Sequence, residues 1–193
     1  MPNLKITLWF FLAAIAGTLL HECGHYIAGV LLGGDPVIHY RYTSPGYTTA
    51  SDMAFGDFIF TLGGPLQTIL TGALGFIGLM WTSRKEPIDA CKTKHLFWIV
   101  LTFFWSREVL RVLLFMLPYQ TGWPADESRL LHHLNIPLFI GYAALLIVFG
   151  ALLAYVTFSI VKEHRKELVI YGVSGSIIGW VAWMYWLGPL LLP

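Results

Sequence analysis

The sequence predicts an all-α integral membrane protein of about five transmembrane helices, with a short β-hairpin-like, membrane-associated loop after the first. Of its 193 residues, 56% are hydrophobic and only 12% are charged, whereas about 25% of a soluble domain is charged. Five apolar stretches are long enough to cross a bilayer, which takes about 20 residues of helix. The linker after the first stretch has the pattern of strands and a turn. We therefore expect a single membrane domain over residues 1–193.

The charged residues are unevenly distributed between the loops that join these stretches. The expected spans cover residues 6–32, 57–81, 95–117, 137–161 and 169–192. If all five cross the membrane, basic residues gather on one side, which predicts a cytoplasmic N-terminus. They are Lys5, Arg84, Lys85, Lys92, Lys94, Lys162, Arg165 and Lys166, against Arg41 and Arg129 on the other side. The net charge of +1 and the lack of a basic stripe argue against nucleic acid as a partner, so the lipid bilayer is the expected one.

The first span contains His21-Glu22-Cys23-Gly24-His25, an HExxH motif, and no other Asp, Glu, Lys, Arg or His between 6 and 32. On a helix, His21 and His25 share one face and can bind one zinc ion, while Glu22 is turned about 100° away and can act on water as a general base. Charged groups at the bilayer centre cost roughly 2.5–3.5 kcal/mol each, so they need partners. The alternative is polar helix packing without a metal. Cleavage after Ala16, as in a signal peptide, would destroy this helix, so we expect an uncleaved span.

The linker from Gly33 to Gly56 predicts a β-hairpin or, at even odds, a simple loop. Val37 to Thr43 is rich in β-branched and aromatic residues, Ser44-Pro45-Gly46 is a turn signal, and Tyr47-Thr48-Thr49 resumes the strand pattern. An exposed strand edge here would be able to pair with an extended peptide segment.

Small residues mark two of the expected spans as packing surfaces. The second span carries Gly63, Gly64, Pro65, Gly72, Gly75 and Gly78, and the last carries Gly172, Gly175 and Gly179 followed by Trp180, Trp183, Tyr185 and Trp186. Glycines let helices approach closely in lipid, and the aromatic residues are typical of an interfacial belt. Cys23 is expected within the bilayer and Cys91 in a polar loop, so no disulfide is expected.

A catalytic zinc ion generally has three protein ligands, so His21 and His25 need a partner. Asp126 is the best candidate, because it follows a segment with two prolines that is able to fold back into the protein. The rivals are Glu127, His132, His133, Asp52, Asp57 and His39. Arg107, Glu108 and Arg111 lie within the third span, where Glu108 and Arg111 have the spacing of an ion pair. They are either structural, or one arginine orients Asp126 or stabilises an oxyanion.

At three places the chain resembles the site-2 protease family of intramembrane zinc metalloproteases. His21 to His25 matches the family's HExxH motif. Gly63-Gly64-Pro65-Leu66-Gln67-Thr68 resembles its Gly-Pro-x-x-Asn element, with Thr68 at the asparagine position. Pro124-Ala125-Asp126-Glu127-Ser128-Arg129-Leu130 resembles Pro-Leu-Asp-Gly-Gly-Arg-Ile, with both glycines replaced and Phe115 at the preceding asparagine position. The resemblance covers a three-span core, 6–131, and leaves 137–192 as two additional C-terminal spans.

The resemblance implies a function and a set of site residues. His21, His25 and Asp126 would bind one zinc ion (Zn2+) per chain, and Glu22 would be the catalytic base. Gly64, Pro65, Gln67 and Thr68 would lie along the substrate, which would be a membrane protein or peptide cut within the bilayer. A multi-pass protein of a prokaryotic cytoplasmic membrane is expected. The resemblance implies a site that opens toward the cytosol, whereas the charge distribution places the Asp126 loop outside.

Three other classes of function are compatible with the same residues. One is a membrane zinc hydrolase that acts on a lipid amide or ester. Another is a metal transporter, which would not need Glu22 between its ligands. The third is a non-catalytic metal-binding protein that escorts membrane proteins, in keeping with the departures at Thr68 and Glu127. Nothing in the sequence predicts the oligomeric state.

Overall fold

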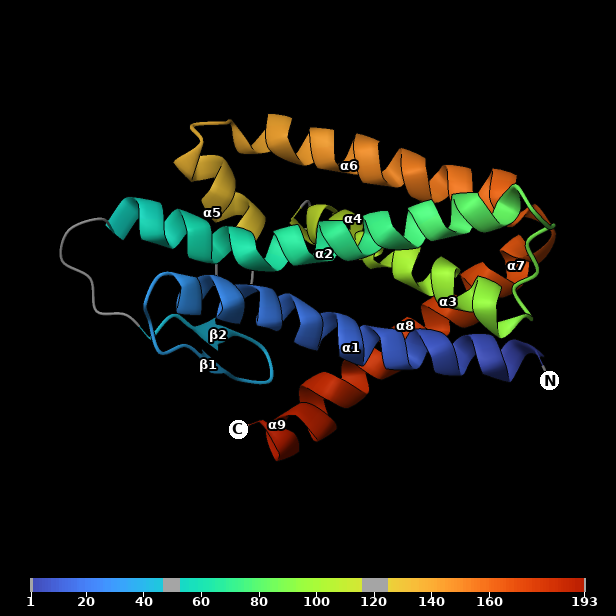
Figure 1. Ribbon diagram of the computed structural model, residues 1–193, viewed down its shortest axis with the longest axis horizontal. Coiled ribbons are helices and arrows are strands. Elements are labelled where there is room, and N and C mark those ends of the chain that lie inside the picture. The colour runs from blue at the N-terminus through green and yellow to red at the C-terminus, as the bar shows by residue number, and fades with distance from the viewer. Residues whose placement is uncertain (1, 47–52, 116–124, 193) are drawn as a thin grey trace.

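The protein is a bundle of long helices with one small two-stranded sheet (Figure 1). The computed structural model describes residues 2–46, 53–115 and 125–192. The elements are α1 (Pro2–Leu31), β1 (Val37–Ile38), β2 (Thr43–Ser44), α2 (Met53–Ser83), α3 (Thr93–Thr102), a 3₁₀ turn (Phe103–Trp105), α4 (Ser106–Phe115), α5 (Asp126–His133), α6 (Leu138–Tyr155), a π turn (Val156–Ile160), a 3₁₀ turn (Lys162–His164), α7 (Arg165–Glu167), a π turn (Leu168–Gly172), α8 (Val173–Ala182), a π turn (Trp183–Leu187) and α9 (Gly188–Leu191).

Four helical segments in the described residues are long and apolar enough to cross a membrane, one fewer than predicted. They are Asn3–Leu31, Phe55–Ser83, Leu138–Ile160 and Lys162–Leu191. The expected third span, 95–117, is not among them. There α3 ends at Thr102, a 3₁₀ turn follows, and α4 carries Arg107, Glu108 and Arg111. These charges and the break in the helix explain why the segment 95–117 does not form one long apolar helix. Residues 116 and 117 lie outside the described ranges.

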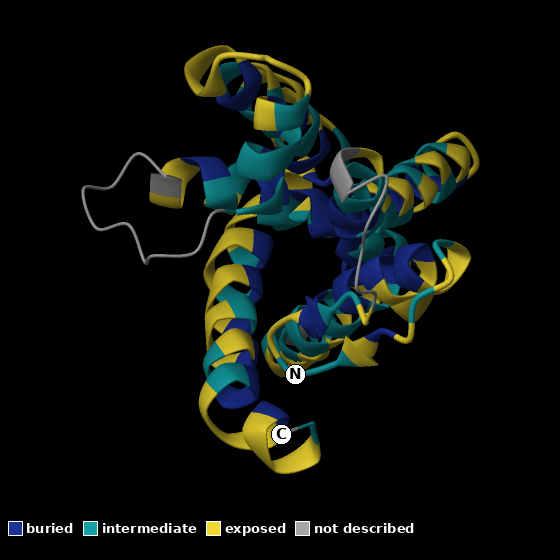
Figure 2. Cartoon of the chain, turned by 90° about the vertical axis from the view of Figure 1, so that its left-hand side faces the viewer, coloured by how far each residue is buried: buried dark blue, intermediate teal, exposed yellow. Residues whose placement is uncertain are grey.

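The outer surface of the bundle is largely apolar. Figure 2 shows that the helices present exposed faces outward and buried faces inward. Large apolar side chains occupy these outward faces, among them Leu12, Leu74, Ile147 and Ile177, each more than half exposed. A soluble monomer rarely exposes apolar surface on this scale, which is consistent with a membrane protein.

Glycines set how closely the helices approach, as the sequence predicted. A Cβ atom added to Gly24 of α1 would lie under 3.0 Å from the carbonyl oxygen of Gly63 in α2, and the reverse holds for Gly63. Gly75 of α2 contacts the backbone of α3 in the same way, at Thr102. Gly175 of α8 contacts the carbonyl of Thr7, so the last long helical segment packs directly on α1.

The predicted hairpin is present, but its turn lies elsewhere. Val37 pairs with Ser44 and Ile38 with Thr43, so residues 39–42 form the turn and the predicted turn at Ser44 to Gly46 is wrong. The His39 amide donates to the Tyr42 carbonyl, and the two rings stack with centroids 4.5 Å apart. The expected strand Tyr47 to Thr49 lies outside the described residues.

The C-terminal end holds the hairpin turn in place. The indole Nε1 of Trp183 donates to the Tyr40 carbonyl over 2.7 Å, and the Tyr40 amide donates to the Leu192 carbonyl over 3.2 Å. Trp183 is only 2% exposed. It is therefore a packing residue and not a member of the predicted interfacial belt, whereas Trp180, Tyr185 and Trp186 are exposed.

Much of the basic charge gathers at one end of the bundle. The N-terminus, the α2–α3 loop and α7 lie together there (Figure 1). Lys5 donates to the Cys91 carbonyl over 2.6 Å and to Thr93 Oγ1 over 2.9 Å, which joins α1 to the loop. Cys23 and Cys91 are both free thiols, as expected.

Replacing Gly75 with alanine should destabilise the bundle. The new Cβ would meet the α3 backbone, and overpacking of this kind costs about 1–3 kcal/mol. Gly56→Ala, in the same helix, is the matched control, because a Cβ there meets nothing within 4 Å. Thermal unfolding in detergent should show a lower midpoint for Gly75→Ala and an unchanged or higher one for Gly56→Ala. Equal midpoints would contradict the close contact between α2 and α3.

Candidate metal centre

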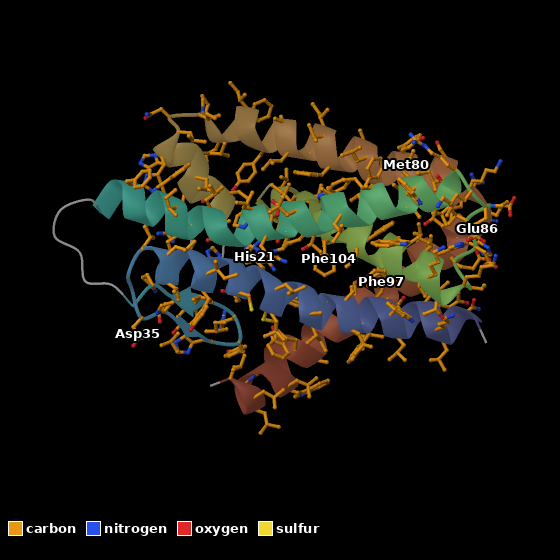
Figure 3. The ribbon with its side chains drawn as sticks, in the orientation of Figure 1. His21, Asp35, Met80, Glu86, Phe97 and Phe104 are labelled. Carbon is orange, nitrogen blue, oxygen red and sulfur yellow. The ribbon has the colours of Figure 1, made fainter. Side chains whose placement is uncertain are left out.

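Three side chains from distant parts of the chain converge where α1 faces α2 and α5. His21 Nε2 lies 3.1 Å from Asp126 Oδ2, His25 Nε2 lies 3.3 Å from the same oxygen, and the two nitrogens are 3.2 Å apart. Figure 3 labels His21 between α1 and α2. His21 is fully buried, His25 is 5% exposed, and the Asp126 side chain is 21% exposed. The two predicted histidines and the predicted carboxylate are therefore brought together.

The three distances match the edges of a zinc coordination tetrahedron. Zinc binds histidine nitrogen and carboxylate oxygen at about 2.0–2.2 Å, which places two ligand atoms of a tetrahedron about 3.3–3.5 Å apart. The observed triangle measures 3.1 to 3.3 Å on its sides. Its atoms therefore need only small movements to hold one ion and leave a fourth position open.

The hydrogen bonds behind the two rings direct lone pairs into the triangle. His25 Nδ1 lies 2.8 Å from the Phe60 carbonyl, which only accepts, so the proton is on Nδ1. His21 Nδ1 lies 3.0 Å from Thr68 Oγ1, whose own proton goes to the Gly64 carbonyl, so this Nδ1 donates as well. Both Nε2 atoms then face each other as acceptors. A cation between them and the carboxylate satisfies all three atoms, as in metal sites whose histidines are fixed by outer hydrogen bonds.

Helix α5 is held in place by polar contacts with the start of α2. Asp57 forms an ion pair with Arg129 through one carboxylate oxygen and lies 2.9 Å from His133 Nε2 through the other. Both partners are on α5, whose first residue is Asp126. These contacts position the third ligand.

The rival ligands have other surroundings. Asp57 and His133 contact each other, His132 is exposed, and His39 stacks on Tyr42. Glu127 is buried beside Glu108, about 100° around the helix from Asp126. Asp52 lies outside the described residues. Of the candidates that the structure describes, Asp126 alone joins the two histidines.

Glu22 lies beside the triangle without being part of it. Its side chain is buried, and its Oε2 accepts a hydrogen bond of 3.0 Å from Thr43 Oγ1 in strand β2. The carboxylate is within electrostatic range of His25 and Asp126. This placement agrees with the predicted role of a base, and sequence reasoning had not identified Thr43 as its partner.

The segment expected to bind substrate lines the metal site in part. A Cβ added to Gly64 would lie under 3.0 Å from Nε2 of both His21 and His25, so a side chain there would collide with the ligand atoms. Thr68 supports His21, and Pro65 is buried within α2. Gln67 donates to Thr71, and its buried Oε1 has no partner among the described residues. Contact of these four residues with substrate stays a prediction.

A cluster of charged residues lies next to the centre. The guanidinium of Arg107 is within electrostatic range of Glu22, Asp126 and Glu127. Glu108 lies against Glu127 and is within electrostatic range of Arg111, but the expected Glu108–Arg111 ion pair is not found among the described residues. Arg107 thus supplies positive charge where carboxylates from α1 and α5 meet.

Comparisons with known proteins leave the family open. No protein-family model, no curated protein and no solved structure matches the chain. The resemblance to site-2 proteases therefore rests on the residues quoted above and stays a prediction.

Replacing Thr68 with valine should weaken zinc binding by about 10–100-fold, the usual effect of removing an outer hydrogen-bond partner of a ligand histidine. Thr68→Ser should bind as the wild type does, because it keeps the hydroxyl. Thr18→Val is the control, since the Thr18 hydroxyl bonds only to Ala14 of its own helix. Zinc per chain after dialysis against graded chelator measures the effect. Equal retention by Thr68→Val and wild type would remove this hydrogen bond from the account.

Proposed function

We propose that this protein is an intramembrane zinc peptidase that cuts peptide bonds of membrane-embedded substrates. The proposal is carried by the convergence of His21, His25 and Asp126 with ligand spacing, next to the buried carboxylate of Glu22. Two imidazoles, a carboxylate and an open fourth position are typical of catalytic zinc, whereas structural sites are closed by four protein ligands.

The depth of the centre along α1 supports an intramembrane site. His21 lies ten residues before the helix ends at Leu31, or about 15 Å along its axis. The hydrocarbon core of a bilayer is about 30 Å thick. If the four apolar helical segments cross a membrane, the candidate ligands lie near its middle, and the protein is a multi-pass integral membrane protein.

The proposed reaction assigns distinct roles to the residues around the centre. His21, His25 and Asp126 would hold the zinc ion, which would supply an activated water and polarise the carbonyl of the scissile bond. Glu22 accepts the proton of the attacking water and returns it to the leaving amine. Thr43 holds the Glu22 carboxylate through its hydroxyl, and Arg107 balances the negative charge of Glu22 and Asp126. The product is a cleaved peptide bond.

The hairpin favours a peptide over a lipid as substrate. Strand β2 carries Thr43 directly to Glu22, so the backbone of this strand runs beside the base. An unwound substrate segment that added to this strand would be held extended next to the centre. Extended backbone is what hydrolysis needs, because helical amides are hydrogen-bonded and shielded. A lipid amide gains nothing from a strand edge.

Replacing Glu22 with glutamine should abolish hydrolysis and spare the metal. Loss of a general base typically lowers the rate by about 10²–10⁴-fold. Zinc content should remain that of the wild type, because Glu22 is not a ligand. Glu163→Gln, at an exposed position in the 3₁₀ turn Lys162–His164, is the control and should keep full activity. The assay incubates purified, zinc-loaded chains with a panel of single-span membrane proteins and with lipid amides.

The same assay separates the alternatives. Cleavage of lipid amides alone would reassign the protein to lipid hydrolysis. If the wild type and Glu22→Gln both bind zinc and no substrate is cleaved in a Glu22-dependent way, an enzymatic function would be contradicted. Zinc transport into vesicles that survives Glu22→Gln would favour a transporter.

A further inference from the structure

A second group of metal-ligand atoms lies far from the first. A carboxylate oxygen of Asp89, the Sγ atom of Cys91 and a ring nitrogen of His164 all lie within 4.8 Å of one another. Asp89 and Cys91 are in the α2–α3 loop, and His164 is in the 3₁₀ turn after α6. Figure 3 labels Glu86, of the same loop, at one end of the bundle and His21 well inside it. These atoms therefore take no part in the candidate metal centre.

We propose that Asp89, Cys91 and His164 form a second zinc site, which fastens the α2–α3 loop to the turn that follows α6.

The chemistry of the three ligands selects zinc. Thiolate and imidazole are preferred by zinc and similar borderline-soft ions, whereas magnesium and calcium prefer sites built from oxygen alone. A mixed set of sulfur, nitrogen and oxygen with a fourth position for water is a normal zinc environment. On binding, the ion takes the place of the thiol proton of Cys91, which is released to solvent.

The spacing fits coordination better than it fits a hydrogen bond. His164 Nε2 lies 3.4 Å from Asp89 Oδ1, beyond the usual 2.7–3.2 Å of an N–H···O bond. The same distance is close to the edge of about 3.3–3.5 Å expected between two ligands of one zinc ion. Cys91 Sγ lies within 4.8 Å of a carboxylate oxygen of Asp89 and of a ring nitrogen of His164. A rotation of its short side chain, moving the sulfur by about 1 Å, would complete the triangle, given Zn–S bonds of about 2.3 Å.

The loop is already ordered in the shape that the site needs. The Cys91 amide donates to Asp89 Oδ1 over 2.8 Å, which aims the carboxylate. The Asp89 amide donates to Nδ1 of the buried His95 over 2.9 Å, and Lys5 donates to the Cys91 carbonyl. Two ligands are thus fixed by α1 and α3, and the third arrives from the far end of α6. A bound ion would add a cross-link where the chain passes from α6 to α8.

The ligand groups interact with one another and are reachable from water. The nearby Glu86 is occupied by Lys92, Lys94 and His95, so it does not compete as a partner of the site. The side chains of Asp89 and His164 are 39% and 26% exposed. Zinc can therefore enter and leave from solvent at this end of the bundle.

Cobalt distinguishes the two sites in the full-length protein, because the first site has no sulfur ligand. Titration of the metal-free wild type with Co2+ should produce a near-ultraviolet thiolate-to-cobalt charge-transfer band. Cys91→Ser and His164→Ala should lose the band, and zinc per chain should fall from two to one in Cys91→Ser. Cys23→Ser, which removes the other thiol, is the matched control and should keep the band.

The readout is independent of the proposed peptidase. Absence of the band in folded wild type, or its survival in Cys91→Ser, would overturn the second site whatever the hydrolysis assay shows. Cooperative thermal unfolding of each variant confirms that lost absorbance reflects a lost ligand. A band present in Asp126→Ala and absent from Cys91→Ser would support the second site even if the first fails.

Discussion

The close approach of α1 and α2 at Gly24 and Gly63 is the contact on which the candidate centre depends. Neither residue can carry a side chain without striking the carbonyl of the other. Because the two backbones meet there, His25 reaches the Phe60 carbonyl and His21 reaches Thr68, both on α2. The glycine inside HExxH thus has a structural role alongside the three residues of the motif that carry chemistry. Gly64, one residue beyond the crossing, leaves the space that the ligand nitrogens occupy.

Buried charge is the second constraint, and several elements share it. Asp126, Glu22, Glu108 and Glu127 would each be costly in an apolar interior. The candidate cation and Arg107 supply the opposite charge. Asp57, near the start of α2, holds α5 through Arg129 and His133. The carboxylate of Asp126, at the first residue of α5, is therefore positioned by contacts that later residues of the same helix make. The short helix α5 is held by these charged contacts together with the buried Leu131, which packs on Gly141 of α6.

Local sequence patterns predicted those features of the candidate metal centre that depend on local backbone geometry. The pairing of His21 with His25 follows from helical spacing, and the irregular segment before Asp126 pointed to a folded-back ligand. The hairpin was predicted by composition, but its turn was misplaced, because long-range bonds from Trp183 and Leu192 hold the chain at Tyr40. The helix break after Thr102 was not predicted, because apolar composition alone does not show where a helix is interrupted. The group around Cys91 carries no motif, since His164 is 73 positions away and is brought near only by the fold.

The central claim is that His21, His25 and Asp126 together hold one zinc ion. X-ray absorption at the zinc edge, on zinc-loaded Cys91→Ser chains, tests it most directly because the second site is then removed. We expect a first shell of nitrogen and oxygen only, at about 2.0–2.2 Å, with the multiple scattering of two imidazoles. We expect this zinc shell to be lost in Asp126→Ala. A sulfur ligand, or fewer than two imidazoles around the ion, would contradict the central claim.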